Sequence, residues 1–175
     1  MKHMLNPLAV GFLLALLILP AQGMDAEEGK VEHPNIILIM ADDMGYGNPR
    51  CFNPDSRIPT PNIDRLARQG MLFTDAHSPA SVCVPTRYGL LTGRYPFRSE
   101  RSEQVESRIE PGRMTLASML AKQGYVTACL GKWHQGFDGG KVRQDYELPL
   151  AGGPVDRGFD YFYGLPASLD IPPYY

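Results

Sequence analysis

The sequence predicts an α/β fold with a mainly parallel central sheet flanked by helices. Residues 35–41 (N-I-I-L-I-M-A) form a continuous apolar run rich in β-branched side chains, as in a parallel strand covered on both faces. A second such run spans residues 125–130, and helix start and stop signals lie between the two. Both runs end in polar, glycine-containing loops, the kind of position where open α/β sheets bind ligands.

Composition supports a globular chain. Of the 175 residues, 43% are hydrophobic and 21% are charged. A chain of this length and hydrophobic content can bury one core. The 18 glycines and 16 prolines indicate many loops, while the long apolar runs argue against disorder. A net charge of −2 provides no basic surface for nucleic acid, so no nucleic-acid partner is predicted.

Residues 1–23 have the pattern of a secretory signal peptide. Lys2 and His3 precede a 12-residue apolar core, and Ala21 and Gly23 are the small residues before the expected cut. The core is shorter than the ~20 residues that span a bilayer, so cleavage is predicted over a permanent anchor. We therefore expect an exported protein, periplasmic or secreted, that meets a membrane only through its signal peptide. Residues 24–33 read as a polar N-terminal tail.

The first predicted strand ends at two neighbouring carboxylates, Asp42 and Asp43. Adjacent side chains on a strand point to opposite faces, so both can serve one ion only where the chain leaves the extended form. Gly45 and Gly47 permit that change. Two hard carboxylates suit calcium or magnesium, whereas the alternative is an ordinary polar turn after a strand.

Three further elements follow in the middle of the chain. Thr60 before Pro61 predicts a helix start, and Gly70 predicts its end. A short strand is expected over residues 71–76. A helix over 115–123 is predicted from its apolar spacing and from the glycine that follows it.

Residues 83–94 read C-V-P-T-R-Y-G-L-L-T-G-R. If Pro85 begins a helix, Cys83 and Arg87 share one face at the helix start, where backbone dipoles favour an anion. A cysteine phosphatase would need an arginine six residues after the cysteine, and Gly89 occupies that position. That alternative is excluded on spacing.

The second strand run delivers G-K-W-H-Q-G at residues 131–136. Lys132 and His134 are two positions apart, so in an extended exit they project to one side, with Trp133 opposite. A lone lysine or histidine would be read as a surface or core residue; together at a strand end they indicate function.

These motifs resemble those of the type I, formylglycine-dependent sulfatases of the alkaline phosphatase superfamily. Residues 83–94 match C-x-P-S-R followed by x-x-L-x-T-G-R, with Thr86 where serine is commoner. Residues 131–136 match G-K-W-H-x-G, with Gln135 where leucine is usual, and residues 153–164 match G-P-x-x-x-G-F-D-x-F-x-G. The resemblance implies an incomplete alkaline-phosphatase-like sulfatase fold, in which residues 34–175 form the N-terminal part of the catalytic domain.

The resemblance also implies roles for individual residues. In that family a formylglycine-generating enzyme oxidises the cysteine to formylglycine, whose hydrate is the nucleophile, so Cys83 would be its precursor. A serine or thiol adduct could not expel sulfate, whereas a hydrate has a second hydroxyl that can. The lysine would hold the sulfate and the histidine would accept a proton. The implied catalytic residues are Cys83, Arg87, Lys132 and His134, of which Lys132 and His134 also bind substrate; the implied metal ligands are Asp42, Asp43 and Cys83.

The predicted function is that of an arylsulfatase-like sulfuric ester hydrolase that uses calcium, or magnesium, and acts on a sulfated small molecule or carbohydrate. One alternative is a phosphodiesterase or phosphonate monoester hydrolase of the same superfamily. Another is an inactive, truncated secreted fragment, because the family's later metal ligands and its later histidine and lysine have no counterpart here. The 175-residue chain alone is expected to be inactive. Whether Cys51 and Cys129 pair is left open.

Overall fold

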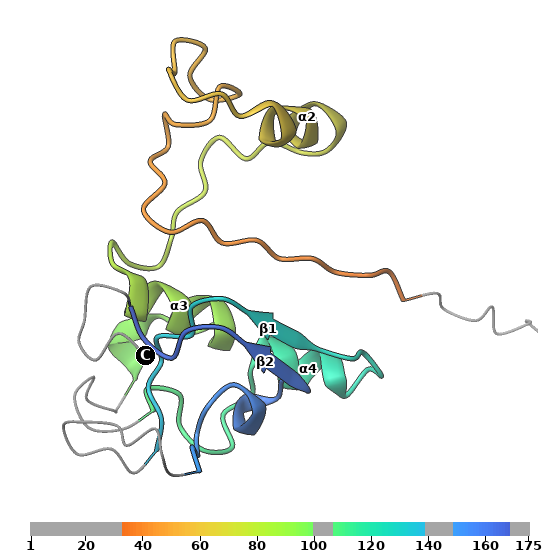
Figure 1. Ribbon diagram of the computed structural model, residues 1–175, viewed down its shortest axis with the longest axis vertical. Helices are drawn as coiled ribbons and strands as arrows, with labels where there is room; N and C mark the ends of the chain where they lie inside the picture. The colour runs from red at the N-terminus through yellow and green to blue at the C-terminus, as the bar shows by residue number, and fades with distance from the viewer. Residues whose placement is uncertain (1–32, 100–106, 139–148, 169–175) are drawn as a thin grey trace, which may run out of the picture. The chain divides into compact units, whose positions relative to one another are not determined.

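The computed structural model describes residues 33–99, 107–138 and 149–168 (Figure 1). The chain divides into two compact units, residues 1–40 and residues 41–175. The predicted signal peptide at 1–23 and nearly all of the predicted tail lie outside the described residues, so both stay predictions. Within the described ranges, no helix has the length and apolar character needed to cross a bilayer.

The predicted strand over residues 35–41 is wrong for this structure. These residues take no regular secondary structure, and Ile37 and Ile39 are 85% and 81% exposed. A continuous apolar run is stable as a strand only when other strands pair with it and both its faces are covered. Among the described residues, the one sheet contains other segments, so this run has no paired neighbour.

The helix predicted from Thr60 to Gly70 is confirmed as α2, Pro61–Gln69. Proline stands in its first turn, where its missing N–H would have no helical partner, and Gly70 follows the last residue. The Thr60 hydroxyl does not cap the helix backbone. It accepts a hydrogen bond from the backbone N–H of Arg50 and donates one to Asp64.

The helix expected near Pro85 is confirmed as α3, Cys83–Thr92, and it begins two residues before the proline. Val82 precedes it in an extended conformation, and Gly93 ends it with a left-handed φ of 66°, which suits a residue without Cβ. Pro85 stays within the first turn, where no intrahelical donor is lost. Cys83 therefore occupies the first helical position. A short 3₁₀ helix, η1, Pro96–Arg98, follows.

The third predicted helix is shorter than expected. It forms as α4, Leu116–Ala121, and a reciprocal capping box between Thr115 and Ser118 fixes its start. The helix ends at Ala121, before the predicted end at residue 123. The chain then turns at Gly124, whose φ is 85°, the residue predicted to stop the helix.

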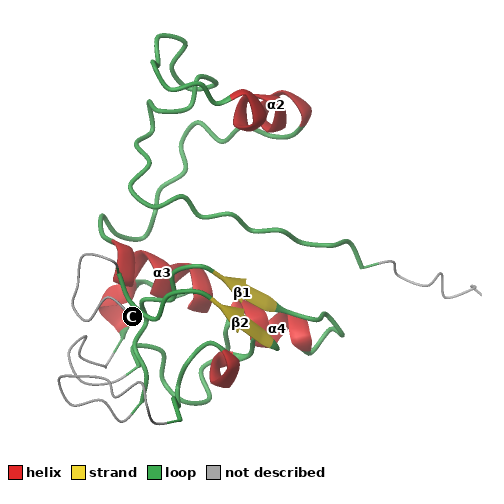
Figure 2. Ribbon diagram, in the orientation of Figure 1, coloured by secondary structure: helices red, strands yellow, loops and turns green. Residues whose placement is uncertain are grey.

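The sheet consists of two parallel strands, β1, Ala128–Leu130, and β2, Tyr161–Tyr163, with Cys129 opposite Phe162. They lie side by side in Figure 1, and a 3₁₀ helix, η2, Val155–Arg157, precedes β2. Figure 2 shows that loops make up most of the remaining described chain. The run predicted over 125–130 is thus a strand only in its second half. The strand predicted over 71–76 is wrong, because those residues are irregular and exposed.

A small aromatic core fixes α3 against the segment after β1. Its buried members come from α3 and from the loops around residues 109 and 133–137. Partly buried side chains from α3, from both strands and from the segment before β2 pack against them. They are Tyr88, Ile109, Trp133 and Phe137, with Leu91, Cys129, Phe159 and Phe162 around them. Parallel strands with packed helices confirm the predicted α/β class.

Candidate active site

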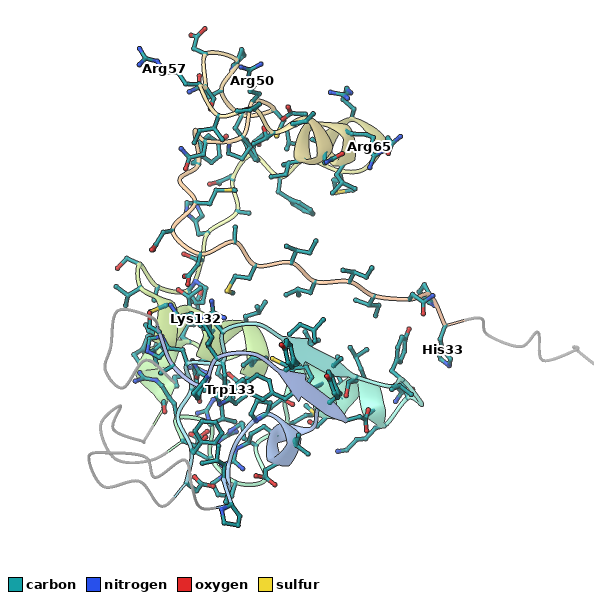
Figure 3. All side chains as sticks on the ribbon, in the orientation of Figure 1. His33, Arg50, Arg57, Arg65, Lys132 and Trp133 are labelled. Atoms are coloured by element: carbon teal, nitrogen blue, oxygen red, sulfur yellow. The ribbon has the colours of Figure 1, made fainter. Side chains whose placement is uncertain are left out.

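Two of the predicted site residues converge on the carboxylate of a third. The Lys132 ammonium donates to Asp42 Oδ2 at 2.8 Å, and Arg87 Nη2 lies 3.6 Å from the same oxygen. Arg87 Nη1 also donates to the backbone carbonyl of Lys132 at 2.6 Å. Figure 3 shows Lys132 next to α3, with Trp133 pointing into the packed side chains. Segments some 45 and 90 residues apart in sequence thus form one polar cluster.

Charge around Asp42 stabilises its ionised form. The hydrogen bond from Lys132 lowers the pKa of this carboxyl below its ordinary value of 3.8, against the opposing effect of partial burial. The charges of Arg87 and His134 act in the same direction as that of Lys132. His134 therefore lies within electrostatic reach of the same carboxylate, and two cationic side chains are held at one point.

Cys83 lies at the start of α3, one helical turn before Arg87, as the spacing predicted. Its side chain is half-buried, and its thiol is free, as are those of Cys51 and Cys129. Cys51 and Cys129 do not pair. The loop before the helix is held by the Thr86 hydroxyl, which donates to the carbonyl of Ala80 at 2.8 Å.

Two site residues have left-handed backbone conformations that are uncommon outside glycine: Asp43, with φ 55°, and His134, with φ 51°. The chain therefore leaves the extended form at Asp43, as a shared ion would require. The extended exit predicted for Lys132 and His134 is wrong at His134. There the backbone follows the irregular segment after β2, because the N–H of Trp133 donates to Leu165 and that of His134 to Pro166. Such conformations persist where surrounding contacts hold them, as these do.

Gln135 was not assigned a role from the sequence, yet it is one of the most buried polar residues, at 2% exposure. Its side-chain N–H₂ donates to the carbonyl of Val84, in the first turn of α3. A signal was present in the sequence: a polar side chain stands at position 135, where the resembled motif usually has leucine. A polar residue on a buried side needs hydrogen-bond partners inside the fold.

The donor chemistry of the cluster fits a hard divalent cation. Asp42 and Asp43 supply carboxylates from consecutive residues, with a non-extended backbone between them, and such oxygens suit calcium or magnesium. Across the part of the chain that the structure describes, no three histidine, cysteine or acidic side chains gather as a metal site. Asp42 is paired with Lys132 and Arg87 instead. Two carboxylates alone are fewer ligands than calcium takes.

Known proteins are similar to this chain over most of its length. The family model described as Sulfatase matches residues 34–174. An N-acetylgalactosamine-6-O-sulfatase of Bacteroides thetaiotaomicron is 39% identical over 97% of this chain and 33% of its own length. The human steryl-sulfatase is 36% identical over 92% of this chain and 27% of its own.

Solved structures agree. One, described under glycosaminoglycan metabolism by Bacteroides thetaiotaomicron, is 40% identical with a TM-score of 0.71 and matches 80% of this chain and 30% of its own. Another, Ps i-CgsB in complex with k-i-k-neocarrahexaose, is 34% identical with a TM-score of 0.62. That match covers 77% of this chain and 28% of the other. The chain spans about a third or less of the length of the relatives it matches. The match over residues 34–174 shows that this chain belongs to the sulfatase family.

Proposed function

We propose that the intact protein is an exported sulfuric ester hydrolase, and that residues 34–175 contribute the N-terminal part of its catalytic domain. The observation that carries the proposal is the convergence of Lys132 and Arg87 on Asp42. Two cations held together at a carboxylate, next to the helix that bears Cys83, suit a small anionic group such as the sulfate of a sulfate ester.

In this proposal each residue has a physical task. Arg87 and Lys132 bind and orient the sulfate through charge-assisted hydrogen bonds, and the Lys132 carbonyl keeps the guanidinium of Arg87 in place. His134 accepts a proton, because a neutral imidazole is a base near pH 7. Its charge acts on Asp42, so the side chain lies within electrostatic reach of the cluster.

Two absent groups complete the proposal. Asp42 and Asp43, with the residue at position 83, would hold calcium, or magnesium, which would neutralise charge on the sulfate group. Cys83 would be converted by a formylglycine-generating enzyme. The hydrate of formylglycine would supply one hydroxyl for attack and a second whose deprotonation re-forms the aldehyde and expels sulfate.

The relatives favour a sulfated carbohydrate as substrate. One is named for a 6-O-sulfated N-acetylgalactosamine, and one solved structure holds a neocarrahexaose. We propose that class for this protein, with aryl sulfates as convenient assay substrates. The 175-residue chain by itself is proposed to be inactive, because too few metal-ligating side chains gather in the described ranges. Calcium titration of that chain by calorimetry tests this, and tight stoichiometric binding would contradict it.

The test of function is a paired assay. The intact protein is coexpressed with a formylglycine-generating enzyme and given an aryl sulfate and the matching aryl phosphate diester and phosphonate monoester. We expect sulfate release to be the fastest reaction. Faster hydrolysis of the phosphorus esters would instead support the phosphodiesterase or phosphonate hydrolase alternative.

The proposed export is tested by N-terminal sequencing of exported material. The sequence read should begin after Gly23, and a sequence that begins at Met1 would contradict the signal peptide.

A further inference from the structure

A single buried side chain connects the two halves of the proposed catalytic cluster. The amide nitrogen of Gln135 donates to the carbonyl of Val84 and to the carbonyl of His134, each at 2.8 Å. Val84 directly follows Cys83, and His134 is the proposed base. The backbone carbonyl of Gln135 accepts from the N–H of Arg108 at 2.7 Å, which anchors the residue from a third segment. Gln135 therefore bridges the backbones beside both reacting groups.

The stability of the fold does not explain why a polar side chain occupies position 135. Its Oε1 is buried and has no hydrogen-bond partner among the described residues. A buried acceptor without a partner is unfavourable, and an apolar side chain of the same shape would avoid that loss. The two donors of the amide are both used. The amide is thus suited to holding two backbone segments in register, at the expense of an unsatisfied oxygen.

The position of His134 depends on such an anchor. Its backbone is in the left-handed region, at φ 51°, which a non-glycine residue keeps only when contacts on both sides hold it. On one side its N–H donates to Pro166. On the other side its carbonyl accepts from Gln135. Without the second bond, the imidazole can shift relative to residue 83.

We propose that Gln135 is a positioning residue that sets the separation between the nucleophile at position 83 and the imidazole of His134. This inference rests on the proposed sulfatase function. The Gln135 amide acts through the carbonyls of Val84 and His134 and requires no contact with substrate. A displacement of about 1 Å between reacting groups can lower a rate about 100-fold. The role therefore predicts an effect on turnover larger than its effect on substrate binding.

The test uses two near-isosteric variants of the intact, formylglycine-bearing protein. Gln135→Met keeps the length of the side chain but has no donor, and Gln135→Glu in its ionised form is also without one. We expect kcat for an aryl sulfate to fall roughly 10- to 100-fold, with KM changed by less than about twofold. The melting temperature of Gln135→Met should change little, because removal of the unsatisfied oxygen offsets the two carbonyls left without a donor. Gln135→Leu, which adds no buried charge and also has no donor, serves if the methionine variant does not fold.

Thr127→Val is the matched control. Its hydroxyl likewise donates to a distant carbonyl, that of Gly158, outside the proposed site, so its loss should lower the melting temperature and leave kcat unchanged. Unchanged kcat in the Gln135 variants, or a loss of kcat only in step with stability, would overturn the inference.

A second measurement separates this inference from the proposed function. Hydrogen exchange of the segment 83–92 should be faster in Gln135→Met than in wild type, and unchanged in Thr127→Val. If the wild type releases no sulfate, the proposed function fails, and this comparison alone decides whether Gln135 holds α3. Equal exchange in wild type and Gln135→Met would contradict the positioning role.

Discussion

The two strand runs predicted from the sequence have opposite outcomes. Residues 35–41 are the more apolar and β-branched run, yet they form no strand and are exposed. Residues 125–130 are less apolar, yet their second half forms β1, because Tyr161–Tyr163 supplies a parallel partner in register. Composition therefore indicates where a strand belongs, while pairing decides whether it forms.

The difference also divides the candidate site. Lys132 and His134 follow a paired strand, and their backbone is held by Leu165 and Pro166. Asp42 and Asp43 follow the unpaired run, and Asp42 is held through its side chain by Lys132 and Arg87. One half of the site is thus fixed by backbone pairing and the other by charge.

The largest expected effect is on the paired half. Trp133→Ala removes a buried indole that packs edge-on against Phe159 and donates to the carbonyl of Gly136. We expect the free energy of unfolding to fall by about 3–5 kcal/mol. Ile37→Ala, in the exposed run, should change it by less than about 0.5 kcal/mol. Urea unfolding of both variants measures the contrast, and equal losses would show that residue 37 is buried in solution.

The charged half should matter chiefly for activity. In the intact protein, Asp42→Ala or Asp43→Ala removes a proposed metal ligand and should lower kcat/KM for an aryl sulfate by roughly 100-fold or more. Metal analysis should show lower calcium content in both variants. Near-normal turnover with full calcium in both would refute the assignment.

The pairing of β1 and β2 can be disturbed at the glycines that follow the two strands. A Cβ at Gly164 would overlap the backbone of Gly131, so Gly164→Ala must push the segments that follow β1 and β2 apart. We expect a loss of about 1–3 kcal/mol and a red-shifted emission from Trp133, the only tryptophan. Gly112→Ala, whose Cβ meets open space, should lower stability through its left-handed backbone alone and leave the emission unchanged.

The smallest effect concerns the ion pairs of Asp42. Because the folded-state pKa of this carboxyl is lowered, its stabilising contribution is complete above the ordinary value of 3.8 and is lost as the pH falls through the lower folded-state pKa. The carboxyl is partly exposed, so we expect Asp42→Asn to lower stability by only about 0.5 kcal/mol at pH 7. The difference from wild type should shrink below pH 4. A difference independent of pH would argue against the ion pairs.

Local signals predicted the helices well and the sheet poorly. Pro61 and Gly70 mark the ends of α2 because the backbone preferences of proline and glycine act within a few residues, whereas Thr60 precedes the helix without capping it. The strand at 71–76 and the one at 35–41 failed because strand formation depends on partners distant in sequence.

The site followed the same division. Spacing placed Cys83 and Arg87 on one helical face, as found. Two features could not be read from spacing: the left-handed backbone of His134, which depends on Pro166, and the bond from Gln135 to Val84. Both arise from tertiary contacts.

The most direct test of the account is made at position 83. The intact protein is coexpressed with a formylglycine-generating enzyme, the tryptic peptide 69–87 is weighed, and sulfate release is followed for wild type and Cys83→Ser. We predict an aldehyde at position 83 and many turnovers for wild type, and at most one slow turnover for Cys83→Ser, because a serine adduct lacks the second hydroxyl. Steady multiple turnover by Cys83→Ser, or by wild type that carries an intact thiol, would contradict the mechanism and leave Cys83 a structural residue.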